Sequence, residues 1–509
     1  MRVVHAASVG LLITLALMGC AVGPTFHSPA PPASDKYTSK PLPSITQATE
    51  VSGGEAQHLQ FGRDLSGEWW TLFGSAGINR LIQEAMNRYP DIAAQQAALR
   101  AAGEDVKAQR GVLFPQIDGT AAFQREKVSG ASIAPGFPAF ITNIYQATVN
   151  VSYTFDLFGG ERRVLEQLRA KEQAQSFALE ASYLTLTSNV AATAIELASL
   201  NDQIVATREI IAIETRQLDF IQRRFEAGSL TRADILQQQS NLASVRATLP
   251  QLMQQQATAE HHLAVLTGHF PHEIESPTVA LSDLKLPEDL PVSLPSALVA
   301  QRPDIRAQEA VMHQASAAVG IATSNLLPQL TLTAAVGTES LRASDLFQPA
   351  AGVWNLAGGI TQPVFRGGAL RAKRRAAIDQ YDQTRANYDL TVLKAFQNVA
   401  DTLTALESDA QTLHAAHDAL DAAQASLDFV KRQYDAGAVN YVLLLSAQQI
   451  YQQALLAHVK AVASRFTDTV TLFQALGGGW WNRSDPGVLQ TTAKETNARV
   501  PTSHSDQLQ

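Results

Sequence analysis

Strict alternation of apolar and polar residues marks two stretches in each half of the chain. The clearest alternates Tyr145, Ala147, Val149, Val151, Tyr153 and Phe155 with Gln146, Thr148, Asn150, Ser152 and Thr154. A period of two with aromatic residues at both ends is typical of a strand with a lipid-facing side and a polar lumen side. Alternation alone fits a soluble, half-buried hairpin equally well. We predict strands at about 116–128, 143–156, 329–340 and 352–364.

After each second strand the pattern becomes helical. No proline interrupts residues 161–227, and apolar residues keep a seven-residue spacing at Tyr183, Val190, Leu197, Ile204, Ile211, Leu218 and Phe225. The spacing returns at Val392, Val399, Leu406, Leu413, Leu420, Leu427 and Tyr434. Such heptads predict a coiled-coil seam, and at ~1.5 Å per residue the first helix would be about 100 Å long. We interpret charged residues such as Arg208 and Lys431 as a solvated face.

A glycine ends each long helix. Gly228 and Gly437 can take the left-handed conformation that caps a helix, and a new helical pattern begins within a few residues. We predict long helices at about 161–227 and 369–436 and return helices at about 231–268 and 440–475. Each pair forms a hairpin with a tight tip.

These elements belong to an internal repeat. The segment Tyr89-Pro90-Asp91-Ile92 returns as Arg302-Pro303-Asp304-Ile305, and Phe158-Gly159-Gly160 returns as Arg366-Gly367-Gly368. The predicted fold is mainly α, with two tandem repeats at 76–270 and 298–476 joined by a linker at 271–297. Each repeat combines a β-hairpin with a long coiled-coil helical hairpin.

The number of strands restricts the assembly. Two hairpins supply four strands, whereas single-chain bacterial barrels need at least about eight. Three copies would supply twelve strands that close into a membrane β-barrel, and their helices would continue it as an α-helical barrel.

The first 19 residues are interpreted as a signal peptide, because Arg2 precedes an apolar stretch too short for a permanent membrane helix. The stretch ends in Leu17-Met18-Gly19-Cys20, which has the pattern of a lipobox, and Cys20 is the one cysteine of the chain. We predict a covalent lipid on Cys20, with Ala21 favouring the outer membrane. Residues 20–75 are interpreted as a lipidated arm, and residues 477–509 as a disordered tail.

Charge argues against one class of partner. The full chain carries −8, and removal of the signal peptide with Arg2 gives −8 − 1 = −9 for the mature chain. An acidic chain without a concentrated basic segment is not typical of a nucleic-acid-binding protein.

Taken together, these segments resemble the TolC-like outer-membrane efflux protein family, in particular its lipoprotein branch of OprM and NodT. The resemblance rests on Cys20-Ala21-Val22-Gly23-Pro24, Pro303-Asp304-Ile305, both glycine tips, the glycine pairs before the long helices, and Ala475-Leu476-Gly477-Gly478-Gly479-Trp480. It implies a homotrimeric exit duct in the outer membrane with a long periplasmic extension. It also implies two partners, a periplasmic adaptor that meets the helical tips and an inner-membrane pump, usually of the resistance-nodulation-division class.

The resemblance also implies functional residues at the tips: Arg224, Gly228 and Asp234 in the first, Tyr434 and Gly437 in the second. Gated members of the family place acidic residues six and nine positions after the second glycine, where this chain has Leu443 and Ser446. An aperture ring of charge would therefore rest on Asp234. The equally weighted alternative is that Asp234 caps the return helix.

The sequence indicates no enzyme and no cofactor other than the lipid. It lacks a phosphate-binding glycine-lysine loop, a His-Glu-x-x-His motif and a Gly-x-Ser-x-Gly elbow. The adjacent His261 and His262 point about 100° apart on a helix, so they are interpreted as structural. The competing hypothesis is a membrane-tethered coiled-coil scaffold or adaptor, which would need no amphipathic strands.

Overall fold

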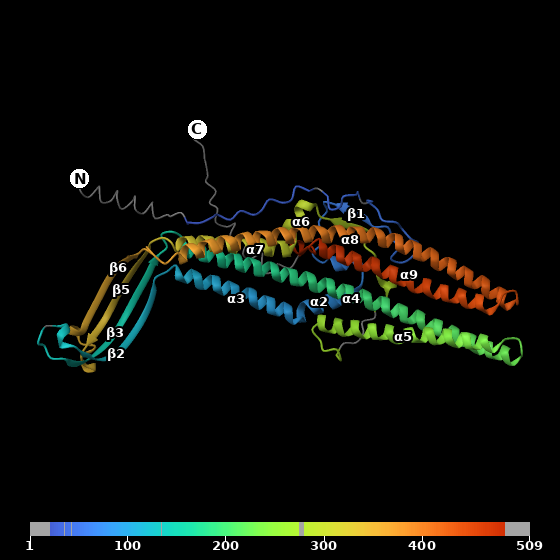
Figure 1. Cartoon of the computed structure of the whole chain (residues 1–509), viewed down its shortest axis with the longest axis horizontal. Coiled ribbons are helices and arrows are strands. Elements are labelled where there is room, and N and C mark those ends of the chain that lie inside the picture. Colours follow the sequence, from blue (N-terminus) through green and yellow to red (C-terminus); the bar gives the residue numbers. More distant parts are fainter. Residues whose placement is uncertain (1–20, 35, 42, 134, 274–278, 484–509) are drawn as a thin grey trace, which may run out of the picture. The chain divides into compact units, whose positions relative to one another are not determined.

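The computed structural model describes residues 21–34, 36–41, 43–133, 135–273 and 279–483. Within these ranges the chain forms two compact units. The first combines residues up to 29 with 98–175 and 308–388, and the second contains the rest. Figure 1 shows that the strands of the first unit lie side by side, whereas the second unit is built mainly of long helices.

The first unit holds a four-stranded antiparallel sheet in the order β2-β3-β5-β6. Its strands are β2 (Gln116–Val128), β3 (Phe140–Phe155), β5 (Gln329–Ser340) and β6 (Gly352–Thr361). The strand β6 ends at Thr361 rather than 364, two residues before Pro363, which cannot donate a backbone hydrogen bond. Short 3-10 helices connect the strands: η2 (Gly130–Ser132), η4 (Ala343–Asp345) and η5 (Pro349–Ala351).

The strand register places most of the apolar residues of the four strands on one face. Ile117 pairs with Val151, Val151 pairs with Ala334, and Ala334 pairs with Leu356. The neighbouring row joins the polar residues Asp118, Asn150 and Asn355, with the small Ala335 between the last two. On this second face Asn150 donates to Thr120 Oγ1 at 3.0 Å. The sheet therefore has one apolar and one polar side.

The helices of the two repeats match in length. The long helices α4 (Gly160–Glu226) and α8 (Ala369–Asp435) both have 67 residues. The return helices α5 (Arg232–Leu266) and α9 (Tyr441–Ala475) both have 35. The heptad residues Val190, Val399 and Leu413 are fully buried, and each such side chain stabilises the packing by about 1.5–3 kcal/mol.

Shorter helices complete each repeat. The first repeat contains α2 (Ala76–Arg88) and α3 (Pro90–Val112). The second contains α6 (Pro295–Gln301) and α7 (Pro303–Ser324). In both repeats a proline opens the helix that leads to the sheet, where its missing N–H costs nothing.

The arm and the linker are more ordered than the sequence predicts. In the arm, β1 (His58–Phe61) pairs in parallel with β4 (Asp289–Val292) of the segment interpreted as a linker, which also holds η3 (Leu281–Asp283). The buried Arg465 of α9 fastens the arm: it donates to Gly53 O at 3.1 Å and to Gln57 Oε1 at 3.1 Å. These bonds replace the water that a buried guanidinium loses.

Part of the predicted disordered tail is folded. Residues 477–483 contain η6 (Trp480–Asn482), and the Trp480 indole donates to Gln301 O at 2.7 Å. Residues 484–509 lie outside the described part of the chain. Next to this segment, η1 (Trp69–Phe73) brings Trp69 and Phe73 against Phe466 and Phe473 in an aromatic core. The Trp480 ring of the segment after α9 packs against Phe177, which helps to hold this segment in place.

Among the described residues, none of the helices combines the length and the apolar character required to cross a membrane.

Candidate functional site at the helical tips

Both hairpin tips depend on a glycine in the left-handed region. Gly228 has φ 76° and Gly437 has φ 75°. At the first tip Ser229 N donates to Arg224 O at 2.9 Å, and Gly228 N donates to Phe225 O at 2.8 Å. This pair of bonds is a Schellman motif, which satisfies the last carbonyl groups of α4 and reverses the chain. The second tip repeats it, with Ala438 N donating to Gln433 O at 2.9 Å.

Asp234 lies in the first turn of α5 and caps that helix. Its carboxylate accepts hydrogen bonds from Thr231 N at 2.8 Å and from Thr231 Oγ1 at 2.7 Å, while Thr231 accepts one from Asp234 N. This capping box satisfies two backbone donors that the helix leaves free. The structure thus gives Asp234 the capping role. Its role in an aperture ring stays a prediction.

The second tip uses a different cap. Asn440 accepts a hydrogen bond from Leu443 N at 3.1 Å and begins α9. Leu443 and Ser446, which stand where gated relatives place acids, are both exposed. The second return helix therefore begins without a carboxylate in its first turn.

A small core holds the two tips together. Ile221 of α4 packs in one buried cluster with Tyr434 of α8 and Tyr441 of α9, whose rings lie 5.9 Å apart between centroids. Burial raises the pKa of the Tyr434 phenol, and the positive charge of Arg224 lowers it in part. Asp234 acts on the same phenol and raises its pKa. Three of the five predicted tip residues, Arg224, Asp234 and Tyr434, are therefore close enough to interact.

A buried polar network lies directly behind this core. The Gln238 amide donates to Glu214 O at 3.0 Å and to Glu214 Oε2 at 2.5 Å, and Gln452 donates to Glu214 Oε1 at 3.1 Å. The Tyr441 hydroxyl donates to Gln238 Oε1. Glu214 and Gln238 belong to the first hairpin, whereas Tyr441 and Gln452 belong to the second. The network joins the hairpins through hydrogen bonds that are strengthened by the low local dielectric.

Sequence reasoning missed this network. Glu214 is 1% exposed and Gln238 0%, yet both stand in segments rich in Glu and Gln that have the composition of a solvated helix face. The spacing of the residues within one helix gives no signal, because their burial depends on the other hairpin.

A groove of about 540 Å³ opens beside the network, between α4, α8 and α9. Its walls combine apolar and aromatic side chains with charges of both signs, including Phe220, Leu427, Lys431, Asp435 and Tyr451. Aromatic side chains such as Phe220 and Tyr451 are enriched in surfaces that contact another protein.

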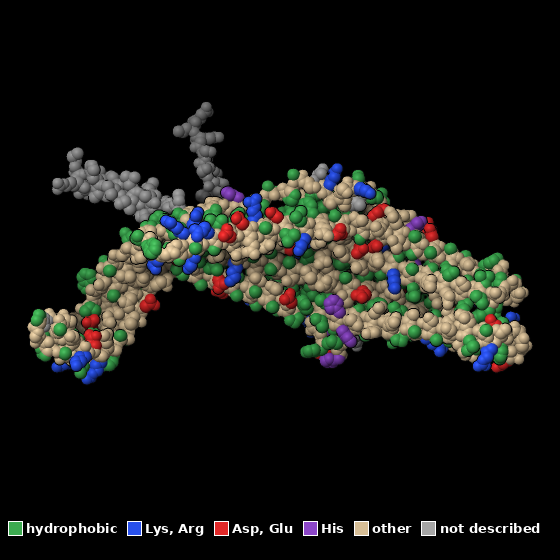
Figure 2. Space-filling view, viewed as in Figure 1, with side chains coloured by type: hydrophobic (Ala, Val, Ile, Leu, Met, Phe, Trp, Pro, Cys, Tyr) green, Lys and Arg blue, Asp and Glu red, His purple; other side chains and the backbone are tan. Residues whose placement is uncertain are grey.

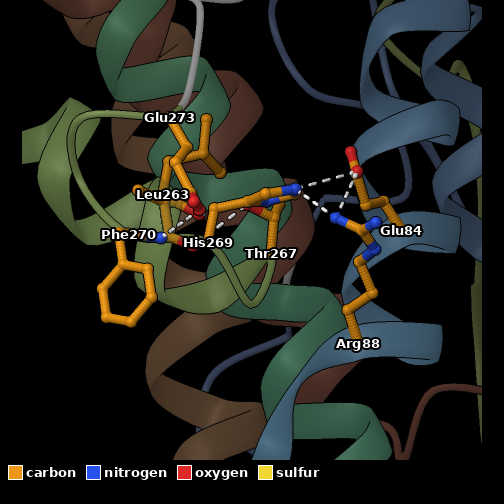
Figure 3. Close-up of polar contacts among 8 residues, drawn as sticks. Glu84, Arg88, Leu263, Thr267, His269, Phe270 and Glu273 are labelled. Atoms are coloured by element: carbon orange, nitrogen blue, oxygen red, sulfur yellow. Dashed lines mark hydrogen bonds and ion pairs between the residues drawn. The ribbon is translucent and has the colours of Figure 1, made fainter.

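The opposite end of the first return helix is fastened to α2 (Figure 3). The helix ends at Leu266, and Gly268 follows with φ 75°, so close to α2 that an added Cβ would lie 2.7 Å from Arg88 O. His269 Nε2 contacts both the Arg88 guanidinium and Glu84, which lies 3.4 Å away. These contacts hold the C-terminal end of α5 against α2.

The remaining candidates from the sequence are the adjacent histidines and Cys20. His262 approaches Thr193 Oγ1 at 3.4 Å and His261 is exposed. No group of three or more His, Cys, Asp or Glu in the described ranges is arranged to hold a metal ion. Cys20 lies outside the described residues, so its lipidation stays a prediction.

Comparison with known proteins identifies the class as outer-membrane channels. The solved structure of the outer-membrane channel OprN superposes with a TM-score of 0.80 at 25% identity, covering 91% of this chain and all of that one. The CmeC outer membrane channel of Campylobacter jejuni gives a TM-score of 0.83 at 22% identity over 95% of this chain and 99% of CmeC.

Sequence relatives agree. The pyoverdine export outer membrane protein OpmQ of Pseudomonas aeruginosa is 31% identical over 421 residues, which are 81% of this chain and 87% of OpmQ. The probable efflux pump outer membrane protein TtgC of Pseudomonas putida is 28% identical over 94% of this chain and 96% of TtgC.

The family model "Outer membrane efflux protein" matches residues 81–269 and 294–478, one match for each repeat. The chain belongs to the outer membrane efflux protein family. The predicted family, the fold class and the outer-membrane location are confirmed by these matches.

Proposed function

We propose that three copies of this chain form a passive exit duct through which an efflux system exports its substrate across the outer membrane. The observation that carries the proposal is the four-stranded sheet, whose one face is apolar and exposed and whose other face is polar. Leu356 and Ile360 on the apolar face are 64% and 73% exposed in the single chain. Such a surface requires a lipid environment.

The sheet also explains why more than one copy is needed. Within the described residues β2 pairs only with β3, and β6 pairs only with β5, so both edges offer free backbone groups. In lipid these groups must be paired, which a closed ring achieves when β6 of one copy meets β2 of the next. Three copies give twelve strands, with the polar faces lining the lumen.

The helical tips are the proposed contact region for the partners, a periplasmic adaptor and an inner-membrane pump of the resistance-nodulation-division class. Arg224, Gly228, Asp234, Tyr434 and Gly437 lie at these tips, and the groove beside them offers a surface for an adaptor helix. In the closed state the Glu214 network joins the hairpins, and adaptor contact opens the duct by separating them. The pump supplies the energy.

The lipid on Cys20 has a secondary role in this proposal. A trimeric barrel holds itself in the membrane, so the lipid assists sorting and assembly. The scaffold hypothesis is disfavoured because a scaffold would have no use for an exposed apolar sheet.

A matched pair of variants tests the duct. Leu356→Arg places a charge on the lipid-facing side of β6, where it costs about 2–4 kcal/mol near the bilayer midplane. Asn355→Arg places the same charge on the polar face one residue away. We expect Leu356→Arg to reduce the yield of heat-modifiable trimers in membranes. Asn355→Arg should still form trimers, and their cation conductance in planar bilayers should fall.

Wild-type protein that forms no trimers and conducts no ions would reject the duct. Equal tolerance of the two arginines would reject the assignment of the faces.

A further inference from the structure

The chain passes from a strand to a long helix twice, from β3 to α4 at the first junction and from β6 to α8 at the second. As far as the structure describes it, the arm covers only the first junction. At the first junction the arm packs onto the start of α4: Val22 N donates to Phe158 O at 2.9 Å, and Arg163 Nε donates to Val22 O at 3.0 Å. Arg163 is 6% exposed. The arm also touches α7, where a Cβ on Gly23 would lie 2.4 Å from Gly320 Cα. Cys20, the predicted site of the covalent lipid, precedes Val22 by two positions.

The second junction has no such cover in the described part of the chain. The helix α8 begins 209 positions after α4, so Ala372 takes the position of Arg163 in the second repeat, and Arg371 is its neighbour. Arg371 is exposed, as are all residues from 364 to 369 and from 371 to 376. Figure 2 shows Lys and Arg side chains gathered where α8 begins.

Large apolar side chains lie next to these charges. Val364 and Phe365 are 92% and 86% exposed and follow β6, whose apolar face ends at Ile360. An apolar surface followed by an aromatic residue and arginines is typical of the boundary between the hydrocarbon and the head groups of a membrane.

The arginines share one side of α8. Arg374 faces α7, because its Nε donates to Thr323 Oγ1 at 3.2 Å. At about 100° per residue, Arg371 and Arg375 lie about 60° and 100° from Arg374 in one direction, and Lys373 lies about 100° in the other. Ala372 holds the position that faces the arm in the first repeat. Arg375 and Arg371 lie about 60° and 100° from it on one side, and Lys373 lies about 100° from it on the other. Arg366, Arg371, Lys373 and Arg375 form no ion pair with a described residue.

We propose that this second-junction patch, formed by Val364, Phe365, Arg366, Arg371 and Arg375, binds an anionic phospholipid. The arginines hold the phosphate of the head group, and the acyl chains continue along Val364 and Phe365 toward the apolar face of β6. Each subunit then carries a covalent lipid at its first junction and a bound phospholipid at its second. This inference rests on the proposed membrane location of the sheet.

The test measures phospholipid binding to purified trimers by native mass spectrometry. Wild type is compared with Arg371→Gln, with Arg375→Gln, and with Lys373→Gln as a control that loses the same charge on the other side of α8. Each protein is titrated with phosphatidylglycerol and with phosphatidylcholine. A basic residue contributes about 1 kcal/mol to binding of an anionic membrane lipid. We therefore expect each arginine variant to bind phosphatidylglycerol about fivefold more weakly, and Lys373→Gln to bind like wild type.

Three results would overturn the proposal: equal losses in all three variants, equal binding of both lipids by wild type, or displacement of phosphatidylglycerol by inorganic phosphate at matched concentration. A fourth is loss of trimers in the arginine variants with unchanged lipid binding by the remaining trimers, which would assign the patch to a subunit contact. Conductance of the same wild-type preparation is recorded separately. A conducting trimer without lipid binding rejects only the patch, whereas a non-conducting protein rejects the duct.

Discussion

At the scale of single residues, Glu214 is the centre of the hydrogen-bond network that joins the two hairpins. Its carboxylate is almost fully buried and accepts hydrogen bonds from Gln238 of its own hairpin and Gln452 of the other. A buried carboxylate is costly unless hydrogen bonds satisfy it. An amide that loses this partner costs about 1–3 kcal/mol. Separation of the hairpins therefore exposes or orphans these groups, and the network opposes spontaneous opening.

The structure shows the role of Asp234 in a helix cap, whereas its role in an aperture ring is untested. Two substitutions separate these two roles. Asp234→Asn removes the charge but keeps an oxygen for the cap, whereas Asp234→Ala removes both. We expect both variants to lower cation selectivity and raise open probability in single-channel recordings. Asp234→Ala alone should also destabilise the tip by about 1 kcal/mol, seen as a lower melting temperature.

Asp219→Asn serves as the control, because Asp219 is an exposed acid near the same tip and pairs with Arg223. Unchanged selectivity in both Asp234 variants would reject the ring and leave the cap as its one role.

At the scale of elements, the periodic signals were reliable. Strand alternation gave the faces of all four sheet strands, and the heptads located both long helices, because each pattern reports burial within one continuous element. The pairing of β1 with β4 could not be predicted, since each strand has four residues and the two are more than 200 positions apart. The helix α5 also continues through Pro250. Packing against neighbouring helices overrides the local cost of that proline.

One carboxyl group of α8, Asp409, lies next to Asp468 of α9 and has a pKa near neutrality. Burial, with a hydrogen bond to Asp468 and its negative charge, raises the pKa of Asp409 to about 7, although Arg465 opposes the shift. Since the folded pKa lies above the unfolded value of 3.8, the pair favours folding at acid pH. Stability is lost as the pH rises from about 4 to about 7.

Replacement of Asp409 by Asn should remove this loss. We expect the free energy of unfolding of Asp409→Asn to exceed that of wild type above pH 7 by about 1–2 kcal/mol, after solvent screening of this half-buried group. The measurement is a higher melting temperature. The two proteins should converge below about pH 4. Asp401→Asn, on an exposed position of the same helix, should follow wild type at every pH. A constant difference across the pH range would show that the titration of Asp409 is not the cause.

At the scale of the whole molecule, the family match and the open sheet edges together define an assembly that one chain cannot complete. Membership of the family could be predicted from the sequence, because the repeated segments and glycine tips are specific in combination. The attachment of the arm could not. It depends on Arg465, Gln57 and Arg163, which are far apart in the sequence and carry no periodic signal.

The arm leads to Cys20, and replacing this cysteine tests the role of the lipid. We expect Cys20→Ser to lower the abundance or assembly yield of the trimer in the outer membrane, because the anchor is lost before the barrel forms. Trimers that do form should conduct ions like wild type, since the arm contacts from Val22 onward remain. Membrane fractionation and planar-bilayer recordings measure the two effects. Trimers that form at normal yield but fail to conduct would contradict this role.

The matched lengths of the hairpin helices restrict how the length of the hairpins can change. The helices α4 and α8 have the same length, as do α5 and α9. A deletion of seven residues from one of these helices would therefore make the two hairpins unequal in length. Removal of seven residues from all four helices would keep the coiled-coil phase and shorten each helix by about 10 Å. The length of the hairpins can therefore change only by whole heptads, and both repeats must change together.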